Sequence, residues 1–373
     1  MLSQFSPQRF CQARPYGLTD SLLTVADAFP ALVALLCTAE AVYLSGAASL
    51  WKMDFNGAGP GHLAAVPVPW PYRRAARWRL LRRLGRLDVR ELIEGPGGRL
   101  LGILQKQIIA LSLEAGEIHP VFRVPQGGRP KGFALTPAGH LFVGEYWSNP
   151  RRQPLRIWGS ADGGSTWELA HTLPAGSAKH IHNIIWDQHR RGLWVLTGDR
   201  DGECAMLFTA DEFQTVTEII RGGQMIRACQ LFCQPEGLYY GTDTERAANW
   251  FVHLEVSTGT IHTIQPLPGS CLYAARLADR YWLSTSVEPS KVNHDRRPAL
   301  WTSPDLHSWR KVVEFDKDWW PGEYFGFGSL MLPRMQGACP WLVFSAVAVK
   351  QHDLTTFVVK PEALTQLLSD WDR

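Results

Sequence analysis

The stretch SADGGSTW, residues 160–167, decides how the fold of this chain is interpreted. Its two glycines and its aspartate are typical of a tight turn. Thr166 and Trp167 follow at once and favour the start of another strand, since β-branched and aromatic residues are enriched in strands. The stretch is therefore either one isolated hairpin or one copy of a repeated unit, and the rest of the chain decides between the two.

Turns of this kind recur along the chain at a regular spacing. They centre on Gly57, Gly116, Asp162, Asp211, Ser257 and Asp305. The intervals are 46 to 49 residues, except for one of 59 that contains the stretch PVPWPYRRAARWRLLRRLGRLDVR. Seven couplets of apolar runs, each joined by a polar or glycine-bearing turn, follow the same spacing. Four short strands per unit predict a β-propeller, because one four-stranded sheet buries both faces only against neighbouring sheets.

We therefore predict an all-β, single-domain β-propeller over residues 31–360, with seven four-stranded blades, or six as the alternative. An Arg-rich insertion at residues 67–92 separates the first two blades. The last blade has three strands of its own, so we expect a strand from the N-terminal segment 1–30, at SLLTVADAF (21–29), to complete it. Such a strand would cover an exposed sheet edge. Residues 361–373 are predicted to be a helical tail.

The composition is that of a globular protein, with 45% hydrophobic and 20% charged residues. A formal net charge of +3 gives no field that would attract nucleic acid. The seven cysteines are scattered without a CxxC pair, which predicts reduced thiols rather than a disulfide framework or a zinc site. No secretion signal and no apolar segment long enough to span a bilayer are found, so we expect a soluble, cytoplasmic protein.

The turn residues resemble a known motif. Ser160-x-Asp162-x-Gly164-x-Thr166-Trp167 matches the Asp-box of sialidase-like (BNR) propellers, and TADEFQTV and SPDLHSW resemble eroded copies. The resemblance covers blade architecture over about residues 31–360 and not one specific family. It implies that each Asp-box closes an outer turn of its blade, where its aspartate has a structural role. The stretch GRPKGFALTPAGHLFVGEYWSN similarly resembles blades of lactonase and streptogramin-lyase propellers.

On the face opposite such turns, the loops around the inner strands converge, and loops held on a rigid scaffold commonly carry binding and catalytic residues. The candidate catalytic residues there are His182, Asp199, Asp243, Glu323 and Tyr324. The candidate substrate-binding residues are Lys131, Glu145, Tyr146, His180, Arg200, Arg227, Glu245, Arg246 and Glu288.

Two kinds of chemistry fit these residues. Asp199 and Asp243 end equivalent strands of adjacent units and could serve as the two carboxyl groups of glycoside hydrolysis, unless each caps its own turn. Alternatively, His182 or Tyr324 could remove the proton α to a carboxylate in a β-elimination, with Arg227 stabilising the charge that develops. No cofactor is required by either reaction.

The alternation in KHIHN points His180 and His182 the same way, so these two residues could hold a divalent metal with a nearby carboxylate. A hydrogen-bonded histidine pair is the alternative.

The sequence therefore predicts a carbohydrate-active propeller enzyme, a glycoside hydrolase or polysaccharide lyase, acting on a polar or acidic glycan. The alternative is a non-catalytic propeller that binds a glycan or a protein. The basic segment 73–90 holds eight arginines and has leucines near helical spacing, so it could contact a membrane surface or a protein. Alternatively its leucines pack inward and its arginines are solvated. We expect a monomer and no nucleic-acid partner.

Overall fold

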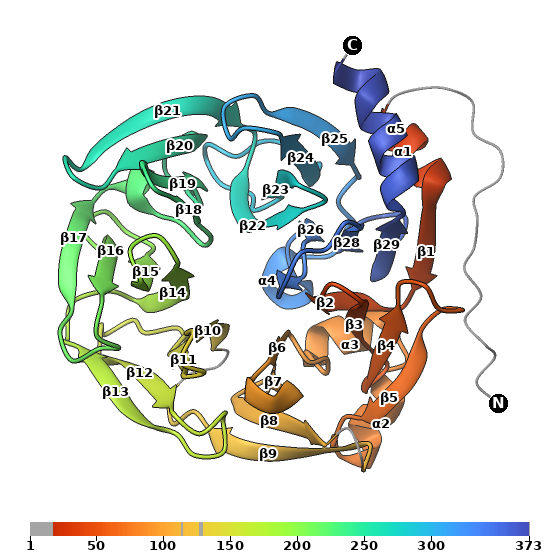
Figure 1. The fold of residues 1–373 in the computed structure, drawn as a ribbon, viewed down its shortest axis with the longest axis horizontal. Helices are drawn as coiled ribbons and strands as arrows, with labels where there is room; N and C mark the ends of the chain where they lie inside the picture. The colour runs from red at the N-terminus through yellow and green to blue at the C-terminus, as the bar shows by residue number, and fades with distance from the viewer. Residues whose placement is uncertain (1–17, 113–114, 127–129, 373) are drawn as a thin grey trace. The chain divides into compact units, whose positions relative to one another are not determined.

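The computed structural model describes residues 18–112, 115–126 and 130–372. Its secondary structure is dominated by short antiparallel strands, with a few short helices (Figure 1). The chain divides into two compact units. One comprises Met1–Val89, Tyr273–Glu288 and Asp295–Arg373, and the other comprises Arg90–Leu272 and Pro289–His294.

The second unit is built from four consecutive meanders, each of four antiparallel strands. The first two consist of β6 (Glu91–Glu94), β7 (Leu100–Leu104), β8 (Gln107–Ser112) and β9 (Glu117–Arg123), then β10 (Lys131–Leu135), β11 (Leu141–Gly144), β12 (Leu155–Ser160) and β13 (Glu168–Leu173). The next two consist of β14 (His180–Asp187), β15 (Gly192–Gly198), β16 (Cys204–Thr209) and β17 (Thr217–Gly222), then β18 (Phe232–Gln234), β19 (Gly237–Gly241), β20 (Asn249–Glu255) and β21 (Thr260–Leu267). Two 3-10 turns, η1 (Pro96–Gly98) and η2 (Gln224–Ile226), lie between strands.

Apolar side chains fill the space between successive sheets of this unit. The second strand of each meander is buried along its whole length, whereas the fourth strand is largely exposed. Phe142 and Ile157 pack with Ile184 of the next sheet, and Trp194 of that sheet packs with Tyr240 of the one after it. Each of these sheets is thus stabilised by burial of its faces against a neighbouring sheet.

The SADGGSTW turn joins β12 to β13 and is closed by its aspartate. Asp162 Oδ1 accepts hydrogen bonds from Ser160 Oγ at 2.8 Å and from the Thr166 amide at 2.9 Å, and Oδ2 accepts from Thr166 Oγ1 at 2.7 Å. The bonds from Thr166 hold the pKa of Asp162 down at about 2. Gly164 has φ of +86°, and a Cβ there would lie 2.3 Å from Leu101. The carboxylate therefore acts locally, within its turn.

Asp211 and Asp305 bond in the same way in their own turns. Asp211 accepts from the side chains of Thr209 and Thr215, and Asp305 accepts from the side chains of Ser303 and Ser308. Three turns of the predicted series thus share one hydrogen-bond pattern.

The first unit contains three four-stranded sheets. One consists of β2 (Val33–Cys37), β3 (Ala41–Gly46), β4 (Ser49–Asp54) and β5 (Gly61–Ala65). A second consists of β22 (Ser270–Leu277), β23 (Arg280–Ser286), β24 (Ala299–Ser303) and β25 (Arg310–Glu314). The third has the order β1 (Ala26–Pro30), β29 (Thr355–Val359), β28 (Leu342–Val347) and β26 (Ser329–Met331). The short strand β27 (Arg334–Met335) pairs in parallel with β2. One core cluster, which includes Leu44, Trp282 and Phe344, joins these sheets.

The N-terminal strand extends its sheet at the outer edge. β1 pairs antiparallel with β29, from Ala26 opposite Val359 to Pro30 opposite Thr355. The strand expected over residues 21–29 begins only at Ala26, because α1 (Leu18–Val25) precedes it. The side chain of Leu22 is fully buried in the same cluster as that of Leu364 of the C-terminal helix α5 (Pro361–Asp372). Contact with that helix explains why a helix forms here.

The insertion forms two short helices, α2 (Trp70–Ala75) and α3 (Arg79–Gly85), instead of one amphipathic helix. Trp78 is extended between them, and α3 ends at Arg86 in the left-handed conformation. The expectation that the leucines of this segment pack inward holds for Leu87, which is buried, and not for Leu81 and Leu84, which are exposed. Arg82 and Arg83 are buried, although the arginines were expected to be solvated. The short helix α4 (Gly322–Phe325) lies against α3.

Within the described residues, no helix is long and apolar enough to cross a membrane. The six cysteines in the described part of the chain are all free, as the scattered spacing predicted.

Candidate active site

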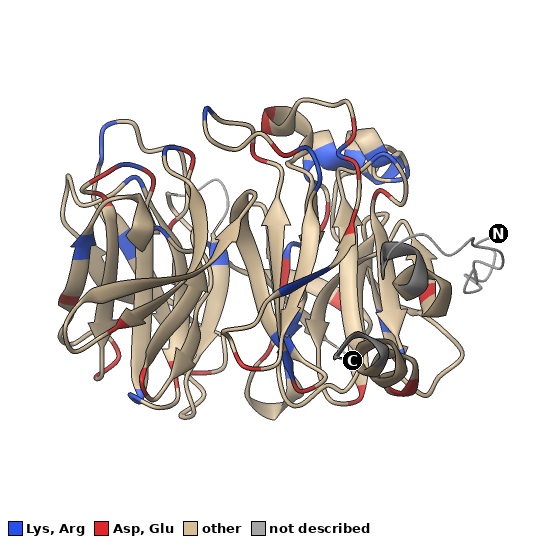
Figure 2. Cartoon of the chain, turned by 90° about the horizontal axis from the view of Figure 1, so that it is seen from above, with Lys and Arg blue, Asp and Glu red and all other residues tan. Residues whose placement is uncertain are grey.

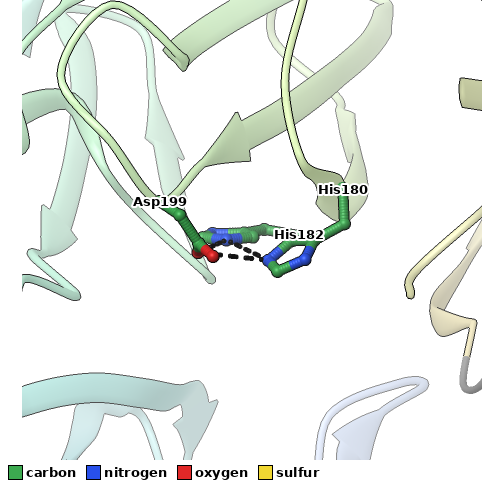
Figure 3. A group of neighbouring side chains, drawn as sticks. All are labelled: His180, His182 and Asp199. Atoms are coloured by element: carbon green, nitrogen blue, oxygen red, sulfur yellow. Dashed lines mark hydrogen bonds and ion pairs between the residues drawn. The ribbon is translucent and has the colours of Figure 1, made fainter. Parts of the chain in front are cut away.

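A cluster of ionisable side chains in the second unit gathers most of the predicted site residues. His180 and His182 lie at the start of β14, and Asp199 directly follows β15. Arg227 follows η2, and Asp243 lies two residues after the end of β19. Figure 3 shows the side chains of His180, His182 and Asp199 pointing toward one another. They are brought together because β14 and β15 are paired, with His180 opposite Gly198.

Three atoms converge at the centre of this cluster. The Nε2 atoms of His180 and His182 lie 3.0 Å apart. Asp199 Oδ1 lies 3.2 Å from His180 Nε2 and 3.5 Å from His182 Nε2 (Figure 3). Asp199 has φ of +137°, a conformation that L residues rarely adopt. Such strained residues cluster at functional sites.

The hydrogen-bond partners fix the protons of the two imidazoles. His182 Nδ1 lies 3.1 Å from the carbonyl oxygen of Ala228, so this nitrogen carries the hydrogen and donates it. A neutral His182 therefore has its lone pair on Nε2. His180 can then donate from Nε2 to that lone pair or to Asp199. His180 Nδ1 is buried and has no hydrogen-bond partner among the described residues.

The electrostatics of the cluster favour a neutral histidine beside an ionised carboxylate. Burial lowers the pKa of His180 to about 4, although the hydrogen bond to Asp199 acts in the opposite direction. Burial alone would raise the pKa of Asp199, but the hydrogen bond from His180, the contact with His182 and the charge of Arg227 hold it well below its ordinary value. At neutral pH the centre therefore contains a carboxylate and an uncharged imidazole.

Two cations compensate the acidic groups. Arg227 Nη2 lies 3.3 Å from Asp199 Oδ1, 3.4 Å from Asp243 Oδ2 and 3.4 Å from Glu245 Oε1. Lys179 Nζ lies 2.6 Å from the other oxygen of Asp199. Asp199 and Asp243, which the sequence suggested as an acid and a base, thus share one guanidinium.

Cys229 belongs to the cluster, and the sequence analysis did not identify it. Its Sγ donates to Asp243 Oδ2 at 3.3 Å and lies 3.7 Å from His182 Nδ1. Burial raises the pKa of the Cys229 thiol well above its ordinary value, so it stays protonated. The sequence could have indicated Cys229 by its position two residues after Arg227, since alternate residues of an extended segment face the same side.

An aromatic ring and a lysine adjoin the histidines. The ring centroids of Tyr146 and His180 are 4.0 Å apart, and Lys131 Nζ lies 4.3 Å from the centre of the Tyr146 ring. Glu145, next in sequence to Tyr146, is fully buried and is bonded within its own sheet. It accepts from the Arg156 amide at 3.1 Å, and burial raises its pKa. Glu145 therefore holds strands together and offers no exposed carboxylate to a substrate.

The remaining predicted residues lie on the surface or in the other unit. Arg200 and Arg246 are exposed. Glu288, Glu323 and Tyr324 belong to the first unit. Both Glu323 and Tyr324 are exposed on α4.

The cluster also offers a set of metal-ligand atoms. Among the described residues, His180, His182 and Asp199 form one such group, and His182, Cys229 and Asp243 form another. Ligands bound about 2.0–2.2 Å from one cation lie roughly 3.0–3.5 Å from each other, which matches the first group. The bond from His182 Nδ1 to a backbone carbonyl is also typical of metal-binding histidines. Arg227 and Lys179 contact the same carboxylate and would compete with a cation.

Comparisons with known proteins bear on the fold. No family model and no curated protein matches the chain. An oligogalacturonate lyase in complex with manganese is similar with a TM-score of 0.57 and 8% identity, over 91% of this chain and 94% of that one. A chain of the mitotic checkpoint complex has a TM-score of 0.54 and 11% identity, over 94% and 97%. The GH74 xyloglucanase from Xanthomonas campestris has a TM-score of 0.53 and 13% identity, over 77% and 47%.

These similarities define the class of the protein by its fold alone. The lyase and the xyloglucanase have propeller-type folds, and the repeated four-stranded antiparallel sheets of this chain agree with them. The chain is therefore an all-β protein of the propeller type.

Proposed function

We propose that this protein is a carbohydrate-active enzyme that cleaves an acidic glycan by β-elimination at the His180–His182–Asp199 cluster. The observation that carries the proposal is the convergence of two imidazoles and an ionised carboxylate, with Arg227 and Lys179 beside them. Similarity to solved structures that include a lyase and a xyloglucanase supports a carbohydrate substrate. We further propose that the seven four-stranded sheets are seven blades of one propeller.

Elimination suits this cluster better than hydrolysis. A glycoside hydrolase needs one carboxyl group that is protonated at its working pH, to donate a proton to the leaving oxygen. Asp199 is held ionised by its donors and cannot supply that proton. Elimination instead needs an uncharged base, and the lone pair on His182 Nε2 can take this role. His180, with a pKa of about 4, stays neutral beside it at physiological pH.

The reaction balances with the groups of this chain and water. His180 carries a proton on Nε2, and His182 carries a lone pair on Nε2. This lone pair accepts the proton from the carbon α to a uronate carboxylate. The electron pair of the broken C–H bond forms a C=C bond with the neighbouring carbon, whose bond to the glycosidic oxygen breaks. The leaving oxygen takes a proton from water. Asp199 stabilises the protonated imidazole pair, while Arg227 or Lys131 neutralises the substrate carboxylate.

A metal centre is the second candidate role for the same cluster, favoured by the 3.0–3.5 Å separations of its ligand atoms. His180, His182 and Asp199 would hold the cation, whose charge would neutralise the substrate carboxylate. Titration with Mn²⁺ or Zn²⁺ followed by calorimetry tests this role. Binding that is lost in His180→Gln and kept in His119→Gln, an exposed histidine on β9, supports it, and absence of binding contradicts it.

The non-catalytic alternative is favoured by burial, since His180, His182 and Arg227 are each at most 4% exposed. In that case the cluster holds strands together and the protein binds a glycan or a protein without cleaving it.

A substrate assay separates these functions. Purified protein is incubated with oligogalacturonate, alginate and neutral xyloglucan, while reducing ends and the ultraviolet absorbance of unsaturated uronates are followed. Reducing ends together with the unsaturated product from an acidic glycan support the proposal. Reducing ends without the chromophore indicate a hydrolase, and no cleavage of any glycan indicates a binding protein; either result contradicts it. His182→Gln should abolish elimination, whereas His119→Gln should not.

A further inference from the structure

Five large apolar or aromatic side chains of the insertion are exposed, and we call them the insertion surface. They are Trp70 (67% exposed), Tyr72 (53%), Trp78 (71%), Leu81 (47%) and Leu84 (47%). They lie on α2 and α3 and on the extended residue between these helices. Apolar patches of this kind on a protein surface mark interaction sites.

The outward orientation of this surface is fixed by buried arginines. Arg82 and Arg83 are 2% and 8% exposed. Arg82 pairs with Asp88 and donates to the carbonyl oxygens of Ala31 at 2.6 Å and Ser45 at 3.0 Å. These bonds attach one turn of α3 to the sheet of β2 and β3, which precedes it in the chain.

Arg83 is held by hydrogen bonds to two carboxylates and one carbonyl oxygen. Its Nη1 donates to Asp318 at 2.5 Å and to Asp353 at 3.0 Å, and its Nε donates to the carbonyl oxygen of Phe325 at 2.6 Å. Because residues 81 and 84 lie on the side of the helix opposite residues 82 and 83, anchoring the arginines holds both leucines toward solvent. Burying leucines would be the usual way to stabilise such a helix, so their exposure favours a binding role.

Positive charge surrounds the insertion surface. Arg73, Arg74, Arg77 and Arg79 are exposed, and in the part of the chain that the structure describes none of the four forms an ion pair. The Arg74 guanidinium lies 4.8 Å from the ring centre of Trp70. Figure 2 shows the basic residues gathered on these short helices. The occupant of this surface should therefore be negatively charged.

We propose that the insertion surface binds the headgroup region of an anionic lipid bilayer. Tryptophan and tyrosine side chains favour the membrane–water interface, and arginines beside them pair with lipid phosphates. The two leucines would insert among the first acyl carbons, as the apolar face of an interfacial helix does. An acidic glycan or a nucleic acid offers no apolar interior, so neither accounts for the exposed leucines.

The neighbouring helix extends the same surface. α4 contacts α3, and Arg86 of the insertion donates to the carbonyl oxygen of Glu323 at 3.3 Å. Tyr324 on α4 is 60% exposed. The tyrosine that the sequence suggested as a catalytic base thus lies beside the insertion and fits a role in membrane contact.

Vesicle co-sedimentation tests the proposal. Wild-type protein should sediment with vesicles of phosphatidylcholine and phosphatidylserine, weakly or not at all with phosphatidylcholine alone, and less as salt is raised. The double variant Leu81→Ser, Leu84→Ser and the double variant Arg73→Gln, Arg77→Gln should each lower the affinity at least tenfold. Unchanged thermal unfolding would show that both variants remain folded.

Matched controls come from the two strands β9 and β13. Leu169→Ser on β13 and Arg123→Gln on β9 change one exposed leucine and one exposed arginine elsewhere and should leave binding unchanged. Absence of sedimentation with anionic vesicles, equal binding to neutral vesicles, or equal loss in the controls would each overturn the proposal. If the insertion surface binds an acidic protein instead, the protein should not sediment with anionic vesicles.

Discussion

Asp199 is the residue through which the charges of the candidate site are connected. Its two oxygens contact Lys179, His180, His182 and Arg227, and its backbone takes a conformation that L residues rarely adopt. A residue in such a conformation persists only where its surroundings hold it there. The number of its contacts supplies that constraint, and its carboxylate is the main acceptor of the cluster.

Replacing this carboxylate tests the proposed elimination at the scale of one residue. Asp199→Asn removes the negative charge that would stabilise a protonated imidazole, so kcat on an acidic glycan should fall about 10²–10⁴-fold. Asp211→Asn, in an exposed turn, serves as the control and should leave kcat unchanged. A steady-state assay measures both, and an Asp199→Asn variant with wild-type kcat would contradict the proposed role.

The neutral state of His180 makes stability depend on pH. Its pKa is about 4 in the folded protein and about 6.5 ordinarily, so below pH 6.5 the unfolded chain binds more protons. The contribution of His180 to the free energy of unfolding is therefore fully present above pH 6.5. It decreases by about 3 kcal/mol as the pH falls toward 4.

Denaturant titrations at a series of pH values measure this dependence. His180→Gln should flatten the curve between pH 6.5 and 4, whereas His119→Gln should not. A wild-type stability that is constant over this range would show that His180 is not held neutral.

The anchored helix α3 gives a prediction at the scale of one element. Arg83→Met leaves the carboxylates of Asp318 and Asp353 without their shared guanidinium, so the free energy of unfolding should fall by about 3–5 kcal/mol. Arg79→Met, on the same helix but exposed, should change it little. Chemical denaturation monitors both, and equal stabilities would show that the buried pair does not hold the helix.

Local patterns predicted the strands and their turns, because the bonds of Asp162 reach only as far as Ser160 and Thr166. The alternation of His180 and His182 was equally local. The orientation of α3 could not be predicted, since the partners Asp318 and Asp353 of Arg83 follow it by more than 230 residues. The helix α1 in place of a strand likewise depends on distant packing against α5.

For the molecule as a whole, the strand β1 joins the N-terminal part of the chain to its C-terminal part by pairing with β29. Deleting residues 1–30 would remove β1, expose the backbone edge of β29 and leave a cavity where Leu22 and Phe29 are buried. We expect the truncated protein to aggregate or to lose cooperative unfolding. Deleting residues 1–17 leaves all described elements in place and should retain a wild-type melting temperature. Normal solubility and unfolding of the longer deletion would contradict the prediction.

Cys229 provides a built-in reporter of motion at the candidate site. Its thiol is buried beside His182 and Asp243, so a thiol reagent can reach it only when the cluster transiently opens. Cys233, which is less buried, should be labelled sooner. The labelling rate of Cys229 therefore measures how often the cluster opens, and a glycan that enters this cluster should change that rate even in a variant that cannot turn it over.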